Sequence, residues 1–414
     1  MSQRSILHVD INNCYASIEI LHHPKLRGHP VAVGGDVAAR HGIILAKDYI
    51  AKKHGVQVGQ ALWEARQLCP NLIIVPPNYD LYLRVSRLLR KIFLNYTDQV
   101  EPYGLDEAWL DVTGSKSLGS GEEIAEEIRQ RVKRELGITV SIGVSWNKIF
   151  AKLGSDMKKP DAITVITREN YQEIVWPLPA QDLLGVGSAT NRKLYSMGVS
   201  TIGDIASFPP KSLQHRLHKW GLILHSFANG LDQSPVEIAG EERIISSVGN
   251  SITAPRDLFD KQDTKIVMMD LSESVAERLR DLGLSSKTVQ ISLRDNNLLR
   301  FERQLKLETP SNLAHDICHT AMQLVEKKYS FTRPLRSVGV RAMDLIPDNS
   351  NLQLSFYSAD VEKRRRLESI ERTMDWLRGR FGHHSVERGI MLSDPVLGKL
   401  NPKEDHVIHP VGYF

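Results

Sequence analysis

The chain has 414 residues, 41% of them hydrophobic and 25% charged, with a formal net charge of +4. This length exceeds one hydrophobic core, so about two to four domains of a globular protein are expected. No stretch reaches the ~20 apolar residues of a membrane-spanning helix, and no secretory leader is visible, so we predict a cytoplasmic protein without membrane contact. The three cysteines form neither a metal-ligand spacing nor a disulfide framework. The mildly basic charge permits a nucleic-acid partner but does not indicate one.

Short strand and helix patterns alternate over the first 144 residues. Apolar alternation predicts one strand that ends at Asp10 and another that follows Glu107. Further strands are predicted at 31–33, 43–45 and 140–144, and helices at 79–97 and 121–136. Residues 47–69 are predicted to be helical, with breaks at Gly55 and Gly59. This order predicts an α+β sheet domain with its helices on one face of the sheet.

The composition changes near residue 175. Prolines bracket a compact helical segment there, and the polar residues 232–246 have the weak patterning of a linker. A second α+β unit is predicted beyond it, with helices at 264–282 and 312–328, a hairpin at 287–307 and a strand at 337–343. A basic helix at 361–380 and an irregular tail are predicted to follow.

Three carboxylates stand out because they lie at the ends of predicted buried strands. Asp106 and Glu107 are adjacent, and Asp10 ends the first strand. Carboxylates on neighbouring strands would repel one another unless cations lay between them, and hard oxygen ligands suit Mg²⁺. Two such ions, about 3.5–4 Å apart, can clamp the attacking and leaving oxygens of a phosphoryl displacement. The residues alone leave two interpretations open: a metal site for nucleotidyl transfer, or ordinary surface carboxylates at strand ends.

Five motifs carry a resemblance to a known family. They are VDINNCYASIE at 9–19, AKDYIAK at 46–52, GLDEAWLD at 104–111, SIGVSWNKIFAKLG at 141–154 and KKP at 158–160. From Ser5 to about residue 347, the chain resembles the Y-family translesion DNA polymerases of the bacterial DinB (polymerase IV) type. The resemblance implies an α+β multidomain fold arranged as a right-hand polymerase.

The resemblance also implies where the domains lie. The expected domains are an α+β palm at 1–20 and 78–170, small fingers at 21–77, a helical thumb with a helix-hairpin-helix at 171–233, a linker at 234–243, an α+β little finger at 244–347 and a C-terminal tail at 348–414.

Carried over to this chain, the family's catalytic metal ligands are Asp10, Asp106 and Glu107, with the backbone carbonyl of Ile11 as a further oxygen. They are expected to hold two Mg²⁺ ions. One ion would activate the 3′-hydroxyl of the primer, and the other would hold the triphosphate. Glu107 is expected to lie nearest the primer terminus.

The resemblance assigns nucleotide contacts as well. Tyr15 matches a steric gate that excludes the 2′-hydroxyl of ribonucleotides, although a core aromatic is the simpler interpretation of the residue alone. Cys14, the residue before it, departs from the family's common Ala-Phe pattern. This departure bears on how strictly the site distinguishes deoxyribose from ribose, not on the reaction. Tyr49, Lys52 and Lys159 match the triphosphate contacts. Lys52 stands where Arg is common, so a looser grip on the phosphates is expected.

DNA contacts are expected in two places. Gly185 and Gly187 resemble a helix-hairpin-helix, whose backbone amides approach a DNA phosphate, although an ordinary glycine turn remains an alternative. Arg294 and Arg300 lie on the polar face of the predicted hairpin, which is either solvated or, as in the family, placed along the duplex.

Two sequence features near the C-terminus lie outside the predicted polymerase domains. Gln353, Leu354 and Phe356 resemble, imperfectly, a peptide that docks on the bacterial sliding clamp; chance similarity is the alternative. The basic helix is predicted to be either a solvated face or an auxiliary DNA contact.

Together these features predict a template-directed DNA polymerase, a nucleotidyltransferase that extends primer 3′ ends. The resemblance implies low-fidelity translesion synthesis without proofreading. The expected partners are primer–template DNA, deoxynucleoside triphosphates and the sliding clamp, and the chain is expected to act as a monomer. A non-catalytic DNA-binding scaffold would not need all three carboxylates, and a palm-type nucleotidyl cyclase would not need the glycine hairpin and second α+β domain. Primer extension with Mg²⁺ distinguishes the three.

Overall fold

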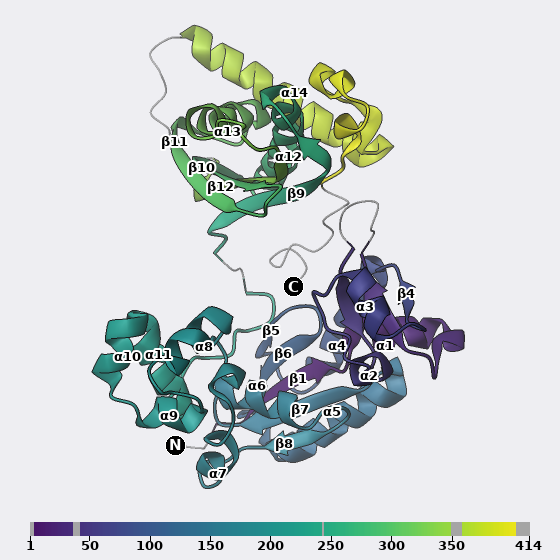
Figure 1. Cartoon of the computed structure of the whole chain (residues 1–414), viewed down its shortest axis with the longest axis vertical. Coiled ribbons are helices and arrows are strands. Elements are labelled where there is room, and N and C mark those ends of the chain that lie inside the picture. The colour runs from purple at the N-terminus through teal and green to yellow at the C-terminus, as the bar shows by residue number, and fades with distance from the viewer. Residues whose placement is uncertain (1–3, 36–41, 242–243, 349–357, 403–414) are drawn as a thin grey trace. The chain divides into compact units, whose positions relative to one another are not determined.

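The computed structural model describes residues 4–35, 42–241, 244–348 and 358–402 (Figure 1). The chain divides into two compact units, each with its own sheet and core. The first contains the described residues of Met1–Gly35 and Ile43–Glu242, and the second contains those of Arg243–Val411. None of the helices in the described part of the chain is long and apolar enough to span a membrane.

The first unit is built around a five-stranded sheet with the strand order β5-β6-β1-β7-β8. Its strands are β1 (Ile6–Ile11), β5 (Val100–Pro102), β6 (Glu107–Asp111), β7 (Val140–Ser145) and β8 (Ile163–Val165). β1 lies in the centre and pairs antiparallel with both β6 and β7. All six residues of β1 and of β7 are buried, as expected for central strands covered on both faces.

Helices cover both faces of this sheet. The main ones are α4 (Tyr79–Phe93), α5 (Gly121–Leu136) and α6 (Lys148–Met157). A Cβ at Gly143 would meet α6 at Ala151, whereas a Cβ at Gly121 of α5 would meet Val144. Since successive strand residues point to opposite faces, α5 and α6 lie on opposite sides. The prediction of helices on one face is therefore wrong, because α6, which covers the second face, was not among the helices predicted from the sequence.

A small three-stranded sheet, β3-β2-β4, forms a separate part of this unit. It comprises β2 (Val31–Gly34), β3 (Ile44–Lys47) and β4 (Ile73–Val75), with α1 (Cys14–His22), α2 (Tyr49–Lys53) and α3 (Leu62–Leu68) nearby. The helical segment predicted at 47–69, with breaks at Gly55 and Gly59, forms two helices, which confirms the predicted breaks. The break between them contains Gly55 and Gly59, whose φ values of 84° and 83° are incompatible with a continuous helix.

The segment after β8 is helical, as predicted. It contains α7 (Tyr171–Val175), α8 (Ser188–Tyr195), α9 (Ile202–Ser207), α10 (Pro210–Leu217) and α11 (Lys219–Ala228). Their apolar residues share one core with Trp146 and Phe150. Thr201 begins α9 with a capping box, in which its side chain accepts a hydrogen bond from the Asp204 N–H.

The second unit has a four-stranded antiparallel sheet in the order β11-β10-β12-β9. It comprises β9 (Ser247–Leu258), β10 (Leu284–Asp295), β11 (Arg300–Ser311) and β12 (Leu335–Pro347), covered by α12 (Lys261–Asp281) and α13 (Ala314–Lys328). Val289, Ile291 and Leu293 of β10 are fully buried, which confirms the predicted core face of the hairpin.

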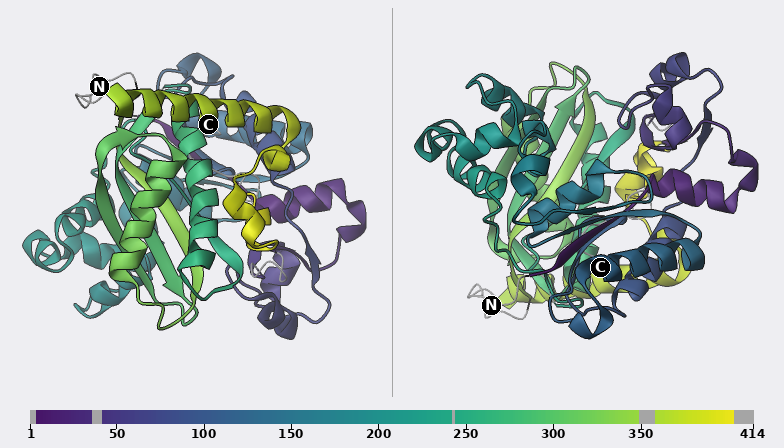
Figure 2. Two further views of the ribbon diagram at one scale, coloured as in Figure 1. Left: turned by 90° about the horizontal axis from the view of Figure 1, so that it is seen from above. Right: turned by 90° about the horizontal axis from the view of Figure 1, so that it is seen from below.

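The described residues after β12, 358–402, pack on this second unit. α14 (Ser358–Phe381) crosses α12 and α13 (Figure 2), and three short 3-10 turns follow it. These turns are η4 (His383–Ser385), η5 (Gly389–Ser393) and η6 (Leu397–Lys399). Met391 and Leu397 are buried in the core of the unit. The described part of the tail that was expected to be irregular is thus integrated into the second unit.

Candidate active site

Asp10 and Glu107 face each other across two neighbouring strands of the first sheet. In the antiparallel pairing of β1 with β6, Asp10 is the register partner of Glu107, so both side chains emerge on the same face. Asp106 precedes Glu107, and its carbonyl oxygen accepts a hydrogen bond from the Ile11 N–H at 3.0 Å. The three carboxylates singled out in the sequence therefore lie at one end of the same pair of strands.

Two lysines neutralise this acidic group. Lys152 Nζ on α6 contacts Glu107 Oε2 directly. Lys159 Nζ lies 2.8 Å from Asp10 Oδ2 and 2.8 Å from Asp156 Oδ1. Each ammonium group stands beside a carboxylate in the manner of a bound cation. Among the residues that the structure describes, no three His, Cys, Asp or Glu side chains form a preassembled metal cluster, since Asp10 and Glu107 each engage a separate lysine.

Burial and charge shift the acidity of the carboxyls in different directions. Burial, partly offset by Lys159, raises the pKa of Asp10 from 3.8 to about 7. Burial and the charge of Glu107 also raise the pKa of Asp106. Burial acts in the same direction on Glu107, but His8 and Lys152 outweigh it and hold its pKa at about 2. Clustered oxygen donors whose charged forms repel one another are suited to a hard divalent cation, so the residues present fit Mg²⁺.

A buried histidine lies beneath Glu107. His8 Nε2 is 3.1 Å from Glu107 Oε2, although this contact is outside hydrogen-bond geometry. On the other side of the ring, Nδ1 is 2.8 Å from the Ser155 hydroxyl. Trp109 packs against the imidazole with its ring centroid 5.1 Å away. Burial lowers the pKa of His8, while its contact with Glu107 acts in the opposite direction. The ring packs beneath the carboxylate and supports it.

Tyr15, the predicted sugar gate, is held by two other tyrosines. Its ring stacks on Tyr82 with the centroids 4.3 Å apart and lies edge-on to Tyr79 at 6.0 Å. Tyr82 donates a hydrogen bond to Glu19 at 2.6 Å, which fixes the stack from behind. The neighbouring Cys14 is buried, so its side chain packs in the interior. The stacked rings form a rigid wall suited to a steric role.

The predicted phosphate contacts lie on α2 and after α6. Lys52 Nζ lies 5.8 Å from the centre of the Tyr49 ring. The pKa of Tyr49 is raised by burial and lowered by the charge of Lys159, which places Lys159 within electrostatic range of the same ring. Lys47 lies near Lys52, since burial and the charge of Lys52 both lower the pKa of Lys47. The three ammonium groups give this region the positive charge that a triphosphate needs.

The two glycines predicted to contact DNA have different local roles. Gly185 has a φ of +89°, and a Cβ there would come within 2.4 Å of the Trp220 ring. Trp220 also donates a hydrogen bond to the Gly185 carbonyl at 3.1 Å, so this glycine is required by packing. Gly187 caps the N-terminus of α8, and a Cβ there would meet nothing within 4 Å. Packing therefore constrains Gly185, whereas the space beside Gly187 is open.

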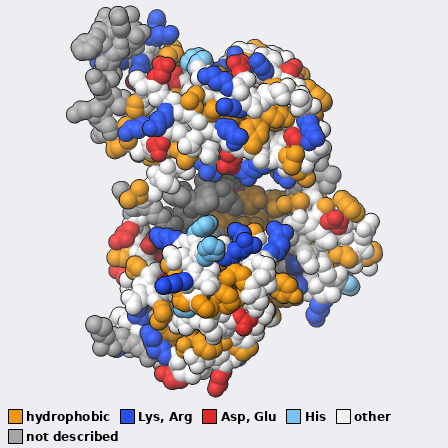
Figure 3. All heavy atoms as spheres, turned by 60° about the vertical axis from the view of Figure 1, so that its left-hand side comes forward, with side chains coloured by type: hydrophobic (Ala, Val, Ile, Leu, Met, Phe, Trp, Pro, Cys, Tyr) orange, Lys and Arg blue, Asp and Glu red, His pale blue; other side chains and the backbone are white. Residues whose placement is uncertain are grey.

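Arg294 and Arg300 are cross-strand partners on β10 and β11, and both are exposed. Arg300 Nη2 donates to Glu302 at 2.7 Å, and its Nε donates to Ser292 at 3.0 Å. Figure 3 shows Lys and Arg side chains on both units, with acidic and apolar side chains between them. On the face shown, no single basic patch of described residues stands out as a DNA surface. Gln353, Leu354 and Phe356, predicted to bind a clamp, lie outside the described residues.

The sequence analysis did not assign roles to His8, Lys47 or Lys152. One signal could have identified the two lysines: Lys47 and Lys152 fall within motifs that carry the resemblance to the polymerase family. Their proximity to the carboxylates and to Lys52 depends on long-range packing; Lys152 and Glu107, for example, are 45 residues apart. His8 precedes Asp10 by two residues on a strand, so strand alternation alone places it on the same face.

Comparisons with known proteins identify the family. Residues 9–156 match the family model described as impB/mucB/samB family, and residues 245–356 match its C-terminal domain. Residues 181–232 match the model of the DNA polymerase-iota thumb domain. A curated relative from Acetivibrio thermocellus, DNA polymerase IV, is 50% identical over 96% of this chain and 100% of its own length. The chain belongs to the Y family of DNA polymerases, of the bacterial DNA polymerase IV type.

Other Y-family proteins extend this result. DNA polymerase IV 1 of Bacillus subtilis is 36% identical over 94% of this chain and 93% of its own length. The solved Y-family DNA polymerase chimera Dbh-Dpo4(243-245)-Dbh superposes with a TM-score of 0.72 over 83% of this chain and 99% of its own, at 24% identity. This structural similarity establishes the α+β multidomain fold expected from the sequence.

Proposed function

We propose that this protein is a template-directed DNA polymerase that extends primer 3′ ends by two-metal nucleotidyl transfer, in translesion synthesis without proofreading. Membership of the Y family supports the reaction class. The observation that carries the mechanism is the pairing of Asp10 with Glu107 across β1 and β6, with Asp106 beside them. These three carboxylates, with the Ile11 carbonyl, would hold two Mg²⁺ ions.

The acidic group is arranged to bind cations and to keep a negative charge. Glu107 remains ionised because His8 and Lys152 stabilise its charge against burial, so it is positioned to orient the primer terminus. Asp10 and Asp106 have raised pKa values, and a nearby divalent cation would favour their ionised forms. The bound ions would supply activation of the 3′-hydroxyl and stabilisation of the leaving pyrophosphate.

The lysines and tyrosines position the incoming nucleotide in this proposal. Lys52 and Lys159, with Tyr49, would bind the triphosphate oxygens, and Lys47 adds charge next to Lys52. Because Lys52 is a flexible point charge rather than a bidentate guanidinium, its hold on phosphate is less directional. Tyr15 would exclude the 2′-hydroxyl, and its stacking on Tyr82 supports a fixed ring position. The buried Cys14 would support the gate from the interior.

Domain names and DNA contacts complete the proposal. The five-stranded sheet corresponds to the palm, the β3-β2-β4 region to the fingers, α7–α11 to the thumb and the four-stranded unit to the little finger. Gly187 at the N-terminus of α8 would contact a phosphate through its backbone, with Gly185 shaping the turn. Arg294 and Arg300 are exposed on the little finger and would contact DNA there.

A sliding clamp is the proposed protein partner, bound through Gln353, Leu354 and Phe356. Their similarity to clamp-docking peptides supports this assignment. The polymerase is proposed to act as a monomer in the cytoplasm, where a bacterial chromosome lies.

Primer extension with the Asp106→Ala variant tests the mechanism. Extension of a primed template with Mg²⁺ is expected to be abolished, while DNA binding measured by fluorescence anisotropy stays close to wild type. Asp80→Asn, a change of an exposed carboxylate on α4, serves as the control and should extend normally. Retained extension by Asp106→Ala would refute the catalytic assignment.

A further inference from the structure

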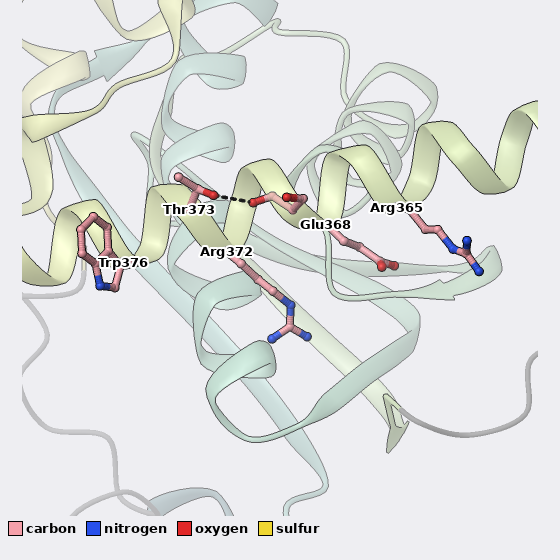
Figure 4. A pocket seen from close by; sticks show the side chains of 6 residues that line it. Arg365, Glu368, Arg372, Thr373 and Trp376 are labelled. Carbon is pink, nitrogen blue, oxygen red and sulfur yellow. Dashed lines mark hydrogen bonds between the residues drawn. The ribbon is translucent and has the colours of Figure 1, made fainter.

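The outward face of α14 is a stripe of polar and aromatic side chains without a role in the polymerase reaction. Figure 4 shows this stripe, which lines a shallow pocket on the helix. The outward face consists of Arg365, Glu368, Ser369, Arg372, Thr373 and Trp376. Their spacing of three and four residues places them along one side of the helix. The helix also lies beyond residue 356, where the matching family models end.

The inward face of α14 is held by a buried network of charges. Arg280 on α12 pairs with Glu371 at 2.6 Å and with Asp375 at 2.7 Å. Glu371 also pairs with Arg388 at 2.8 Å and accepts a hydrogen bond from the Ala314 N–H at the start of α13. Arg280 and Glu371 are only 6% and 5% exposed. The network therefore fixes the helix to the second unit, and it neutralises the carboxylates of Glu371 and Asp375.

Because these acids point inward, the exposed side of the helix is strongly basic. Among the described side chains of residues 362–381, five exposed ones are basic and one is acidic. They are Lys363, Arg365, Arg366, Arg372 and Arg380, against Glu362. Glu368 lies on the outward face with its side chain 41% exposed, and Arg364 at 3.2 Å balances its charge. A surface with this charge is complementary to a polyanion rather than to an ordinary apolar protein partner.

An aromatic side chain stands among these cations. Trp376 is 58% exposed, and the Arg380 guanidinium lies 5.6 Å from the centre of its ring. Arg380 also lies 5.3 Å from the ring of Phe381, itself 62% exposed. Exposed aromatic rings between cationic groups are typical of surfaces that stack bases while pairing with the phosphates of a single strand. A duplex would supply the phosphates but keep its base faces stacked within the helix.

We propose that the outward face of α14 binds single-stranded DNA, with Arg365 and Arg372 on the phosphates and Trp376 stacked on a base. This contact is additional to the polymerase active site and would hold unpaired template strand on the second unit. It explains why the helix combines exposed rings with a basic face, which a purely solvated helix does not require.

The test uses the full chain and a fluorescein-labelled oligothymidylate of ~20 nucleotides, a length that exceeds common single-strand site sizes. Trp376→Leu is expected to weaken binding in fluorescence anisotropy by about fivefold or more, because stacking is lost. Trp376→Phe, which keeps a ring, should retain most of the affinity. The double variant Arg365→Ala/Arg372→Ala should reduce the slope of log affinity against log salt by about 1.4, since each single-strand phosphate contact contributes about 0.7.

Four controls accompany these measurements. Arg134→Ala removes an arginine whose side chain is 73% exposed on α5 and should leave the affinity unchanged. A blunt duplex of the same length should bind the Trp376 variants as tightly as it binds wild type. Circular dichroism should be unchanged, and extension across a one-nucleotide gap should proceed at the wild-type rate. Unchanged single-strand affinity in both the tryptophan and the double-arginine variants would overturn the proposal, as would a Trp376→Leu variant whose binding weakens equally on the single strand and on the blunt duplex.

Discussion

Replacing Asp10 by asparagine is expected to stabilise the folded first unit while abolishing catalysis. Asp10 is 7% exposed, and burial raises its pKa from the ordinary 3.8 to about 7. The folded carboxyl therefore keeps its proton up to about pH 7, whereas the unfolded carboxyl loses it near pH 4. Folding binds a proton across this window, so the free energy of unfolding falls as the pH rises through it. Asparagine has a similar shape to the protonated carboxyl and carries no charge that burial would penalise.

The size of the effect follows from the two pKa values. They differ by about three pH units, and each unit corresponds to about 1.4 kcal/mol. At pH 8, above both values, Asp10→Asn should raise the free energy of unfolding by up to about 4 kcal/mol. At pH 5 the pH is only about one unit above the pKa of the unfolded carboxyl, so the gain in the free energy of unfolding should shrink to about 1–2 kcal/mol. The attraction of Lys159 is already included, because it is one of the causes that set the pKa of Asp10.

Urea unfolding in EDTA, followed by tryptophan fluorescence, measures this gain. Five of the six tryptophans lie in the first unit, and only Trp376 lies in the second, so the signal reports mainly on the unit that contains Asp10. Asp80→Asn, on the exposed side of α4, should change stability little at either pH. Equal gains at pH 5 and pH 8, or a loss of stability at pH 8, would refute the reasoning.

Three further predictions concern other parts of the chain. Tyr15→Ala should raise ribonucleotide incorporation in single-nucleotide insertion, because the ring that excludes the 2′-hydroxyl is removed; unchanged sugar selectivity would count against the gate. Glu371→Ala removes one of the two carboxylate partners of the buried Arg280 and a partner of Arg388, so it should destabilise the second unit by about 1.5–3 kcal/mol and make α14 sensitive to proteolysis, whereas Glu362→Ala should not. Replacing Gln353, Leu354 and Phe356 by alanine should abolish clamp-stimulated extension but leave extension without the clamp unchanged; intact stimulation would exclude this peptide.

Local patterns in the sequence predicted much of the site. Alternation along 6–11 and after Glu107 located the strand ends that carry the three carboxylates, and the structure pairs those strands directly. Alternation in the 287–307 hairpin identified its buried face. These features were predictable because each depends on the period of a single strand, which the order of apolar residues specifies.

Contacts between distant segments were not predictable in the same way. Lys159 pairs with Asp10 across 149 residues, and Arg280 pairs with Glu371 across 91 residues. Charged residues carry no periodic signal that identifies a buried partner, so α14 could be predicted as a basic helix but not as a docked one. The packing of α6 opposite α5 depends on Gly143, whose missing side chain admits Ala151 and Ser155. A lone glycine in a strand does not by itself specify such an approach.

Anomalous diffraction from crystals of the chain with primer–template DNA, a non-hydrolysable deoxynucleoside triphosphate and Mn²⁺ tests the central claim most directly. The account predicts two peaks about 3.5–4 Å apart, bound by Asp10, Asp106 and Glu107 beside the triphosphate. Metal ions should then contact the carboxylates of Asp10 and Glu107, in addition to or in place of the ammonium groups of Lys159 and Lys152. Peaks located elsewhere, or full occupancy of this site by the two ammonium groups alone, would contradict it.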